Sequence, residues 1–245
     1  HGLHPILLER SYKLSGILNG IDTKSYDPET DKDIFYNFSA KSPENKAKDK
    51  AALQELFGLP VNADTPLIGI VSRLVAHKGF DLIKRVMWDL VASTDMQLVV
   101  LGSGDWEYES FFKELAAAFP GKVGVRLGFI PDMARKIYAG SDMFLMPSKS
   151  EPCGLSQMVA LRYGSIPIVR ETGGLKDTIT DSGDGQGNGF TFKSYDAYDM
   201  LDAIHRALAA YYDKKHWSTL VTRALKCDNS WGRSAREYIK LYQSL

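Results

Sequence analysis

Short apolar runs alternate with amphipathic stretches over most of this 245-residue chain. The apolar runs are rich in β-branched residues and end in polar or glycine-containing segments, which is the pattern of buried strands. In the stretches between them, apolar residues recur three or four positions apart, as in Phe80, Ile83 and Met87, which predicts helices. The expected strands cover 66–72, 97–102, 123–129, 143–147, 166–170 and 189–192.

Regular alternation of strands and helices predicts βαβ units and therefore a parallel sheet. The strand segments are apolar almost throughout, so we expect helices to cover both faces of the sheet. The expected fold class is α/β, with a doubly wound parallel sheet that spans residues 51–212.

Both ends of the chain depart from this alternation. Residues 1–50 hold one expected strand, "GILNGI" (16–21), and a polar linker whose charged part, 41–50, is expected to be a solvated loop. Residues 213–245 hold two expected helices. The chain opens with "HGLHP" and not with Met, which indicates a processed, engineered or partial chain.

Composition narrows the function. Thirty Lys and Arg residues balance 30 Asp and Glu residues, so bulk charge does not favour nucleic acid or an anionic membrane as a partner. No apolar run reaches the length of a membrane span. The two cysteines, Cys153 and Cys227, form neither a disulfide framework nor a zinc motif, which favours a reducing compartment. The two acids of the 181–189 loop lack the ligand spacing of a calcium loop, so no metal site is expected.

The residues that follow the expected strands carry the candidate chemistry. All strands of such a sheet end at one edge, and ligands bind outside it. The residues expected at this edge are Arg73, Lys78, Phe129, Glu151, Cys153, Gly154, Leu155, Ser156, Gly173 and Gly174. Two cations can bind phosphate oxygens, amides at a helix start add donors, and glycines permit close approach of the backbone. The set predicts a diphosphate site.

Other interpretations of these motifs are weaker. The chain has no P-loop motif, and in "GSGDWE" Glu107 stands where a dinucleotide fingerprint needs its third glycine. Cys153 at a helix start has the position of a nucleophile, but His77 is the only base expected at the same edge. We therefore expect a packing role for Cys153. Glu151 suits binding of sugar hydroxyls or stabilisation of developing positive charge, and the alternative is a simple charge at a helix start.

Four segments together resemble the bacterial glycogen synthases, in the family shared with starch synthases: "GILNGID", "SRLVAHKGFDL", "EPCGLSQMVALRYGSIPIVRETGGLKDTI" and "SWGRSAREY". The resemblance covers nearly the whole chain, but only the C-terminal one of two Rossmann-like lobes in the arrangement called GT-B. It implies a bacterial cytoplasmic enzyme that transfers glucose with retention from ADP-glucose to the non-reducing end of an α-1,4-glucan. It implies no cofactor, and the acceptor is bound through the missing N-terminal lobe.

The resemblance also implies roles for matching positions. Arg73 and Lys78 would hold the diphosphate, Glu151 and the backbone from Cys153 to Ser156 would meet the glucose and the distal phosphate, and Phe129 would lie near adenine. Gly173 and Gly174 would line the phosphate side. Catalysis would depend on Glu151, Arg73 and Lys78. Related retaining transferases often carry a second acid eight residues after the first, and here that position is Val159. Either Glu151 works alone or the transition state draws on the missing lobe.

The resemblance places the C-terminal helices of 213–245 toward that missing lobe. The last of them carries an apolar stripe made of Trp231, Ala235, Tyr238, Ile239 and Tyr242, and part of this stripe should lie exposed or be buried by a neighbouring molecule. Two other functions stay open on the sequence: a stand-alone nucleotide-binding module without catalysis, and a phosphorylase-like or other sugar-nucleotide enzyme of similar architecture. The sequence also leaves open ADP against UDP, the oligomeric state and allosteric control.

Overall fold

The protein, described here from a computed structural model over residues 2–183 and 185–244, is built on one six-stranded sheet. The strand order is β3-β2-β1-β4-β5-β6 and every pairing is parallel. This order is that of a doubly wound sheet, with the direction of winding reversed between β1 and β4. The predicted fold class is confirmed. The strands are β1 (Leu67–Leu74), β2 (Gln97–Gly104), β3 (Val123–Leu127), β4 (Met143–Met146), β5 (Ile166–Arg170) and β6 (Phe190–Phe192).

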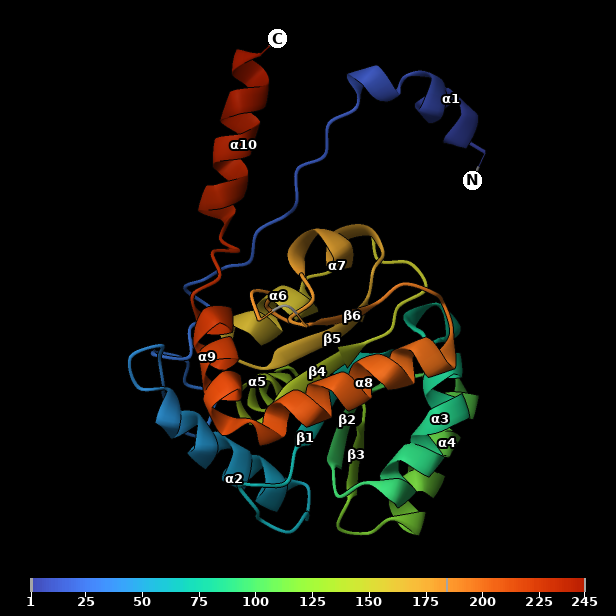
Figure 1. Cartoon of the computed structure of the whole chain (residues 1–245), viewed down its shortest axis with the longest axis vertical. Coiled ribbons are helices and arrows are strands. Elements are labelled where there is room, and N and C mark those ends of the chain that lie inside the picture. The colour runs from blue at the N-terminus through green and yellow to red at the C-terminus, as the bar shows by residue number, and fades with distance from the viewer. Residues whose placement is uncertain (1, 184, 245) are drawn as a thin grey trace.

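Helices cover both faces of the sheet, as Figure 1 shows. Successive residues of a strand point to opposite faces. In β2, Leu98 and Val100 accordingly enter the larger core cluster, whereas Val99 and Leu101 enter a smaller one beneath α2 and α5. The helices are α1 (His4–Glu9), η1 (Ser11–Lys13), η2 (Pro43–Asn45), α2 (Lys46–Leu56), η3 (Ala76–Lys78), α3 (Phe80–Ser93), α4 (Trp106–Ala118), α5 (Pro131–Gly140), α6 (Ser156–Arg162), α7 (Gly173–Thr178), α8 (Ala197–Tyr212), α9 (Lys214–Leu225) and α10 (Trp231–Gln243).

The N-terminal 50 residues differ from the sequence prediction in two places. The expected strand at 16–21 does not form, and only Ile21 makes an isolated bridge, to Ser230. The segment lies against the start of α10 and not at the sheet, so it has no strand to pair with. The expected solvated loop at 41–50 is also wrong, because η2 and α2 form there and bury Lys46, Asp49 and Lys50.

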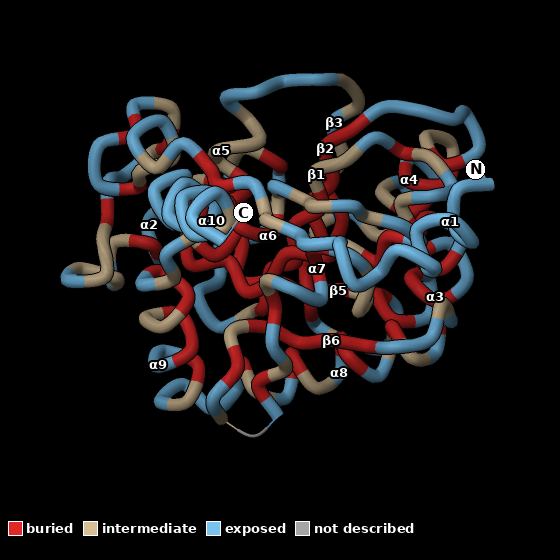
Figure 2. Tube along the Cα trace, turned by 90° about the horizontal axis from the view of Figure 1, so that it is seen from above, coloured by how far each residue is buried: buried red, intermediate tan, exposed pale blue. Residues whose placement is uncertain are grey.

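The two C-terminal helices differ in their packing. Helix α9 packs on the sheet and buries Trp217 and Leu220. Helix α10 buries only Ser234 among its described residues, and the described residues of α1 are all unburied. Figures 1 and 2 show both helices projecting from the same side of the lobe with exposed surfaces. Along α10, Trp231, Ala235, Tyr238, Ile239 and Tyr242 are all exposed. No helix in the described ranges is long and apolar enough to cross a membrane.

Candidate active site at the carboxyl edge of the sheet

A cavity of about 200 Å³ opens at the carboxyl ends of β1 and β4. The cavity lies where the strand order reverses, which is the usual ligand position in doubly wound sheets. Six of the residues expected at this edge line it together: Arg73, Lys78, Glu151, Gly154, Leu155 and Ser156.

Lys78 and Glu151 form an ion pair inside this cavity. The Lys78 Nζ donates to Glu151 Oε2 at 2.5 Å, and Ser148 Oγ donates to the same oxygen at 3.2 Å. Only 20% of the Lys78 side chain and 12% of the Glu151 side chain are exposed. The pair therefore joins the loops after β1 and β4 in a partly desolvated place, where charge interactions are stronger than in water.

The same two loops are also joined through their backbones. Gly79 has φ +84°, and a Cβ at this position would lie 2.2 Å from the carbonyl oxygen of Pro147. The Lys149 N–H donates to the His77 carbonyl at 2.9 Å. Gly79 thus allows the contact that brings Lys78 to Glu151.

Gly173 and Gly174 lie beneath the turn that carries Glu151. A Cβ on Gly173 would be 2.2 Å from the Glu151 carbonyl oxygen, and one on Gly174 would be 1.8 Å from that of Cys153. The Gly174 N–H donates to the Glu151 carbonyl at 3.1 Å. These glycines therefore let α7 pack against the turn, and neither is among the residues that line the cavity. Their predicted contact with phosphate stays a prediction.

Gln157 is a site residue that the sequence analysis missed. Its side chain is buried in the first turn of α6, and its Nε2 lies 3.1 Å from the Cys153 carbonyl, 2.9 Å from the Gly154 carbonyl and 3.1 Å from Thr178 Oγ1. The amide holds the end of the turn to α6 and α7. A glutamine one position into a helix carries no distinctive sequence signal, so its burial becomes visible only in the structure.

Three further positions named in the sequence analysis lie outside this cavity lining. Phe129 was expected as the last residue of a strand over 123–129, but β3 stops at Leu127, so Phe129 lies past the strand end and is 89% exposed. Cys153 is half-buried against the core, in agreement with the packing role expected for it. Val159, where a second acid would stand, is buried in α6.

Comparison with known proteins decides the family. Residues 54–220 match the family described as "Glycosyl transferases group 1". The chain belongs to this glycosyltransferase family. It is 51% identical to the glycogen synthase of Bacillus licheniformis over 98% of its length, and 52% identical to that of Clostridium acetobutylicum over 99%. The chain spans about half the length of these relatives: 50% of the Bacillus licheniformis protein and 51% of the Clostridium acetobutylicum protein. The resemblance to bacterial glycogen synthases is confirmed.

Solved structures agree with this assignment. The catalytic domain of starch synthase IV from Arabidopsis thaliana, bound to ADP and acarbose, superposes with a TM-score of 0.91 at 40% identity, over 99% of this chain and 51% of that one. The sucrose-phosphate synthase of Thermosynechococcus elongatus, at 20% identity and a TM-score of 0.66, shares the fold. The protein is a Rossmann-like lobe of the GT-B glycosyltransferase type.

The start of α6 in this glycosyltransferase lobe rests on a buried tyrosine. Burial raises the pKa of Tyr138 to about 12, although a hydrogen bond with Ser156 opposes this shift. The Tyr138 ring lies 4.9 Å from that of Phe144 in β4, centroid to centroid. Tyr138 is therefore neutral at physiological pH and supports Ser156 at the rim of the cavity.

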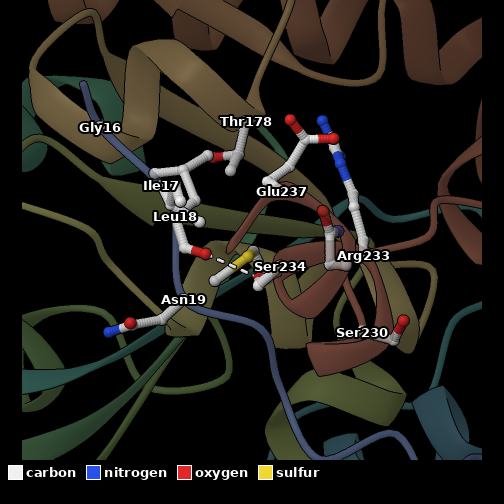
Figure 3. Close-up of a pocket in the computed structure, with 11 residues that line it drawn as sticks. Gly16, Ile17, Leu18, Asn19, Thr178, Ser230, Arg233, Ser234 and Glu237 are labelled. Carbon is white, nitrogen blue, oxygen red and sulfur yellow. Dashed lines mark hydrogen bonds between the residues drawn. The ribbon is translucent and has the colours of Figure 1, made fainter. Parts of the chain in front are cut away.

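A second and larger cavity of about 340 Å³ lies between the N-terminal segment and α10 (Figure 3). Its polar residues include Asn19, Thr178, Arg233 and Glu237. The Ser234 Oγ donates to the Leu18 carbonyl at 2.7 Å across it, which ties α10 to the N-terminal segment of the glycosyltransferase lobe. This cavity lacks the two cations and the buried acid that meet at the strand ends.

Over residues 2–183 and 185–244, no group of three or more His, Cys, Asp and Glu side chains could hold a metal ion.

Proposed function

We propose that this chain is the donor-binding lobe of a glycogen synthase of the bacterial cytoplasm. The whole enzyme would transfer glucose from ADP-glucose to the non-reducing end of an α-1,4-glucan with retention. The observation that carries the proposal is the meeting of Lys78 and Glu151 in a cavity that Arg73 and the start of α6 also line. The starch synthase with the same fold was bound to ADP and acarbose, which supports a nucleotide-sugar donor.

The cations would bind the diphosphate. Arg73 is exposed and, in the described part of the chain, forms no ion pair, so its guanidinium is available for phosphate oxygens. Lys78 would exchange part of its contact with Glu151 for the phosphate. The backbone around Gly154 to Ser156 would add N–H donors, and Phe129 would contact the adenine.

Glu151 would act on the sugar. When the bond between the anomeric carbon and the diphosphate oxygen breaks, the oxygen takes the electron pair, and positive charge develops on the sugar ring. Arg73 and Lys78 would neutralise the leaving diphosphate, and the Glu151 carboxylate would stabilise the ring. Because Val159 is apolar, no second acid at that position would assist. The glucan hydroxyl that attacks the carbon would be positioned by the other half of the enzyme, and its proton would pass to the departing diphosphate.

The exposed apolar side chains of α1 and α10 would pack against that other half. They include Leu8 on α1 and Trp231 and Tyr242 on α10, all at least half exposed. Helices α1 and α10 project on the side of α6 and α7 (Figure 1). This surface would then join the two halves of the enzyme, with the active-site cleft between them.

The test is a titration of this chain with ADP, ADP-glucose, UDP and UDP-glucose in a calorimeter, followed by a transfer assay. We expect ADP and ADP-glucose to bind, and radiolabelled ADP-glucose to give almost no glycogen extension compared with a two-lobe relative. Positioning of reactants contributes about 7–11 kcal/mol in well-oriented reactions, and the acceptor wall is absent here. Binding of none of the four compounds would contradict the proposal. Efficient transfer by the chain alone would instead contradict the proposal that the active-site cleft is shared with the other half of the enzyme. If the chain binds nucleotide but the two-lobe protein transfers no glucose, a nucleotide-binding module without catalysis is favoured.

A further inference from the structure

The turn 148–154, which carries Glu151, is held at both ends by side chains that do not line the cavity. Gln157 holds the C-terminal end through two carbonyls, as described above. At the N-terminal end, Arg170 also donates hydrogen bonds to two backbone carbonyls. The Glu151 side chain itself is fixed by two donors only among the described residues, Lys78 and Ser148. Its position therefore depends on the backbone of the turn.

Arg170 is the last residue of β5 and reaches across to the turn after β4. Its Nε donates to the Ser148 carbonyl at 3.0 Å and its Nη2 donates to the Lys149 carbonyl at 2.5 Å. The guanidinium is a rigid fork, so two bonds to consecutive carbonyls fix both the place and the orientation of that peptide segment. Glu151 follows two residues later.

Arg170 is in turn fixed by Tyr195. The guanidinium lies 5.5 Å from the centre of the Tyr195 ring. The Tyr195 hydroxyl donates to Asp81 Oδ1 at 2.5 Å and lies 3.3 Å from the Ala76 carbonyl. Asp81 and Ala76 belong to the region just after β1 that also presents Lys78. The contacts thus form a closed circuit from the Lys78 loop, through Tyr195 and Arg170, to the Glu151 turn.

We propose that Arg170 is a positioning residue, which sets the Glu151 carboxylate against the donor sugar through the main chain of Ser148 and Lys149. The inference rests on the proposed function, since it assigns Glu151 to the sugar. Loss of the fork would let the turn shift while Arg73 and Lys78 stay in place. Donor recognition would then lose the contribution of glucose and keep that of the diphosphate.

The experiment measures the affinity of this chain for ADP and for ADP-glucose by calorimetry. With Arg170→Gln we expect ADP affinity to change by less than about twofold and ADP-glucose affinity to fall about tenfold, because the displaced Glu151 carboxylate would lose its hydrogen bond to the sugar. The matched control is Arg223→Gln. Arg223 also donates to two loop carbonyls, those of Gly185 and Gly187, but it holds a different loop. We expect the control to leave both affinities unchanged.

A second arm separates positioning from a general structural role. In a Glu151→Gln background, Arg170→Gln should cause no further change in the ratio of the two affinities, because the group it acts through is gone. If Arg170→Gln fails to fold, Arg170→Lys, which keeps the charge and loses the fork, is measured in its place.

The outcomes are distinguishable. Equal weakening of ADP and ADP-glucose by Arg170→Gln, or a loss that persists in the Glu151→Gln background, would overturn the positioning role. A parent chain that binds neither ligand, or whose affinity ratio is unchanged by Glu151→Gln alone, would instead overturn the proposed function on which the inference rests.

Discussion

Strands β1 and β4 carry a lysine–carboxylate pair at each of their two ends. At the amino end, Lys50 Nζ and Asp142 Oδ2 are 2.7 Å apart, and at the carboxyl end, Lys78 Nζ and Glu151 Oε2 are 2.5 Å apart. Each pair borders a cavity, and the amino-end cavity, about 560 Å³, is the larger of the two. Ion-pair distance and cavity size therefore do not indicate which of the two pairs belongs to a functional site.

The surroundings of the two pairs do differ. Lys50 also donates to the Ala63 carbonyl at 3.0 Å and to the Tyr211 hydroxyl at 2.7 Å. Asp142 Oδ2 also accepts from the backbone N–H of Leu67 at 2.9 Å, where β1 begins. The three donors of Lys50 Nζ are thus used within the fold, and Asp142 Oδ2 accepts from both Lys50 and a backbone N–H. The carboxyl-end pair lies beside exposed Arg73 and a helix start, with capacity left for a ligand. An ion pair indicates a functional site only where its side chains keep hydrogen-bonding capacity that the fold itself does not use.

The largest expected effect is on stability, from Asp142→Ala at the amino end. Removal of the carboxylate leaves the Lys50 charge buried without its counterion and the Leu67 N–H without its acceptor, which should lower the free energy of unfolding by about 3–5 kcal/mol. Urea denaturation measures it. Glu151→Ala is the control at the other end, and it should cost less than Asp142→Ala, because Lys78 is 20% exposed and can turn to the solvent of the cavity, whereas Lys50 is 5% exposed. If both variants lose the same free energy of unfolding, the two ion pairs do not differ in their contribution to stability.

The next effect is on catalysis, from Glu151→Gln in the two-lobe enzyme. Loss of the charge that would stabilise the sugar should reduce kcat by about 10²- to 10³-fold, with the unfolding curve unchanged. The measurement is glucose transfer from ADP-glucose to glycogen. Asp142→Asn provides the matched substitution at the other end of the strands, and it should leave kcat near that of the parent. A variant at Glu151 that keeps most of its rate would remove this residue from the chemistry.

A smaller effect concerns donor affinity and Lys78→Ala. Removal of one charged hydrogen bond to a phosphate should weaken ADP binding by about 1.5–3 kcal/mol, or roughly ten- to 150-fold. Calorimetry on this chain measures it, with circular dichroism to show that the fold is intact. Lys50→Met should reduce stability and leave ADP affinity as it was. The role of Lys78 would be excluded if both variants bound ADP as the parent does.

The sequence was informative wherever the relevant contacts follow from chain order. The apolar run before Ser148 predicts a buried strand, and the parallel arrangement then brings Lys78 and Glu151 to one edge without any knowledge of their distance. Segment 41–50 was misjudged because its charges find partners far along the chain: Lys46 bonds to the Ala139 carbonyl at 2.5 Å. Local polarity cannot distinguish such a buried charge from a solvated one.

The glycines and Gln157 show the same limit within the site. The motif "TGGL" predicted a close approach of the backbone, and the approach exists, but its partner is the turn at Glu151 and Cys153. Which neighbour a glycine must admit depends on how α7 packs on that turn. A glycine in the sequence thus predicts that some group approaches the backbone closely. Which group does so can be seen only in the three-dimensional structure.

Stability is also expected to depend on pH through a carboxyl group at the amino end of the strands. Burial raises the pKa of Asp49, beside the amino-end pair, to about 6, although the N–H groups of Tyr36 and Phe35 and the Lys46 charge oppose the shift. The folded protein therefore binds more protons than the unfolded chain between about pH 4 and 6, so this contribution to stability is present below pH 4 and is lost as pH rises through 6.

The matching variant is Asp49→Asn, measured by urea denaturation from pH 4 to 7. The parent should lose stability relative to the variant as pH rises, with a slope that approaches about 1.4 kcal/mol per pH unit for one proton. Parallel stability curves for the two proteins would show that burial does not disfavour the Asp49 charge. Glu151→Gln, at the other end of the strands, is the control for a general effect of lost carboxylates.

The smallest expected effect tests how far the carboxyl-end site extends beyond its ion pair. Phe129 lies past the end of β3, and 89% of its surface is exposed. An aromatic side chain this exposed contributes little to the core and is free to contact a ligand. If it stacks on adenine, Phe129→Ala should weaken ADP binding by about 1 kcal/mol, at the low end for base–aromatic stacking, and leave pyrophosphate binding unchanged. Tyr212, a half-exposed aromatic at the C-terminal end of α8, is the control, and Tyr212→Ala should change neither affinity. Because pyrophosphate has no base, a parallel fall in both affinities would mean that Phe129 acts through the structure of the edge. No change in either would confine the nucleotide site to the cavity between β1 and β4.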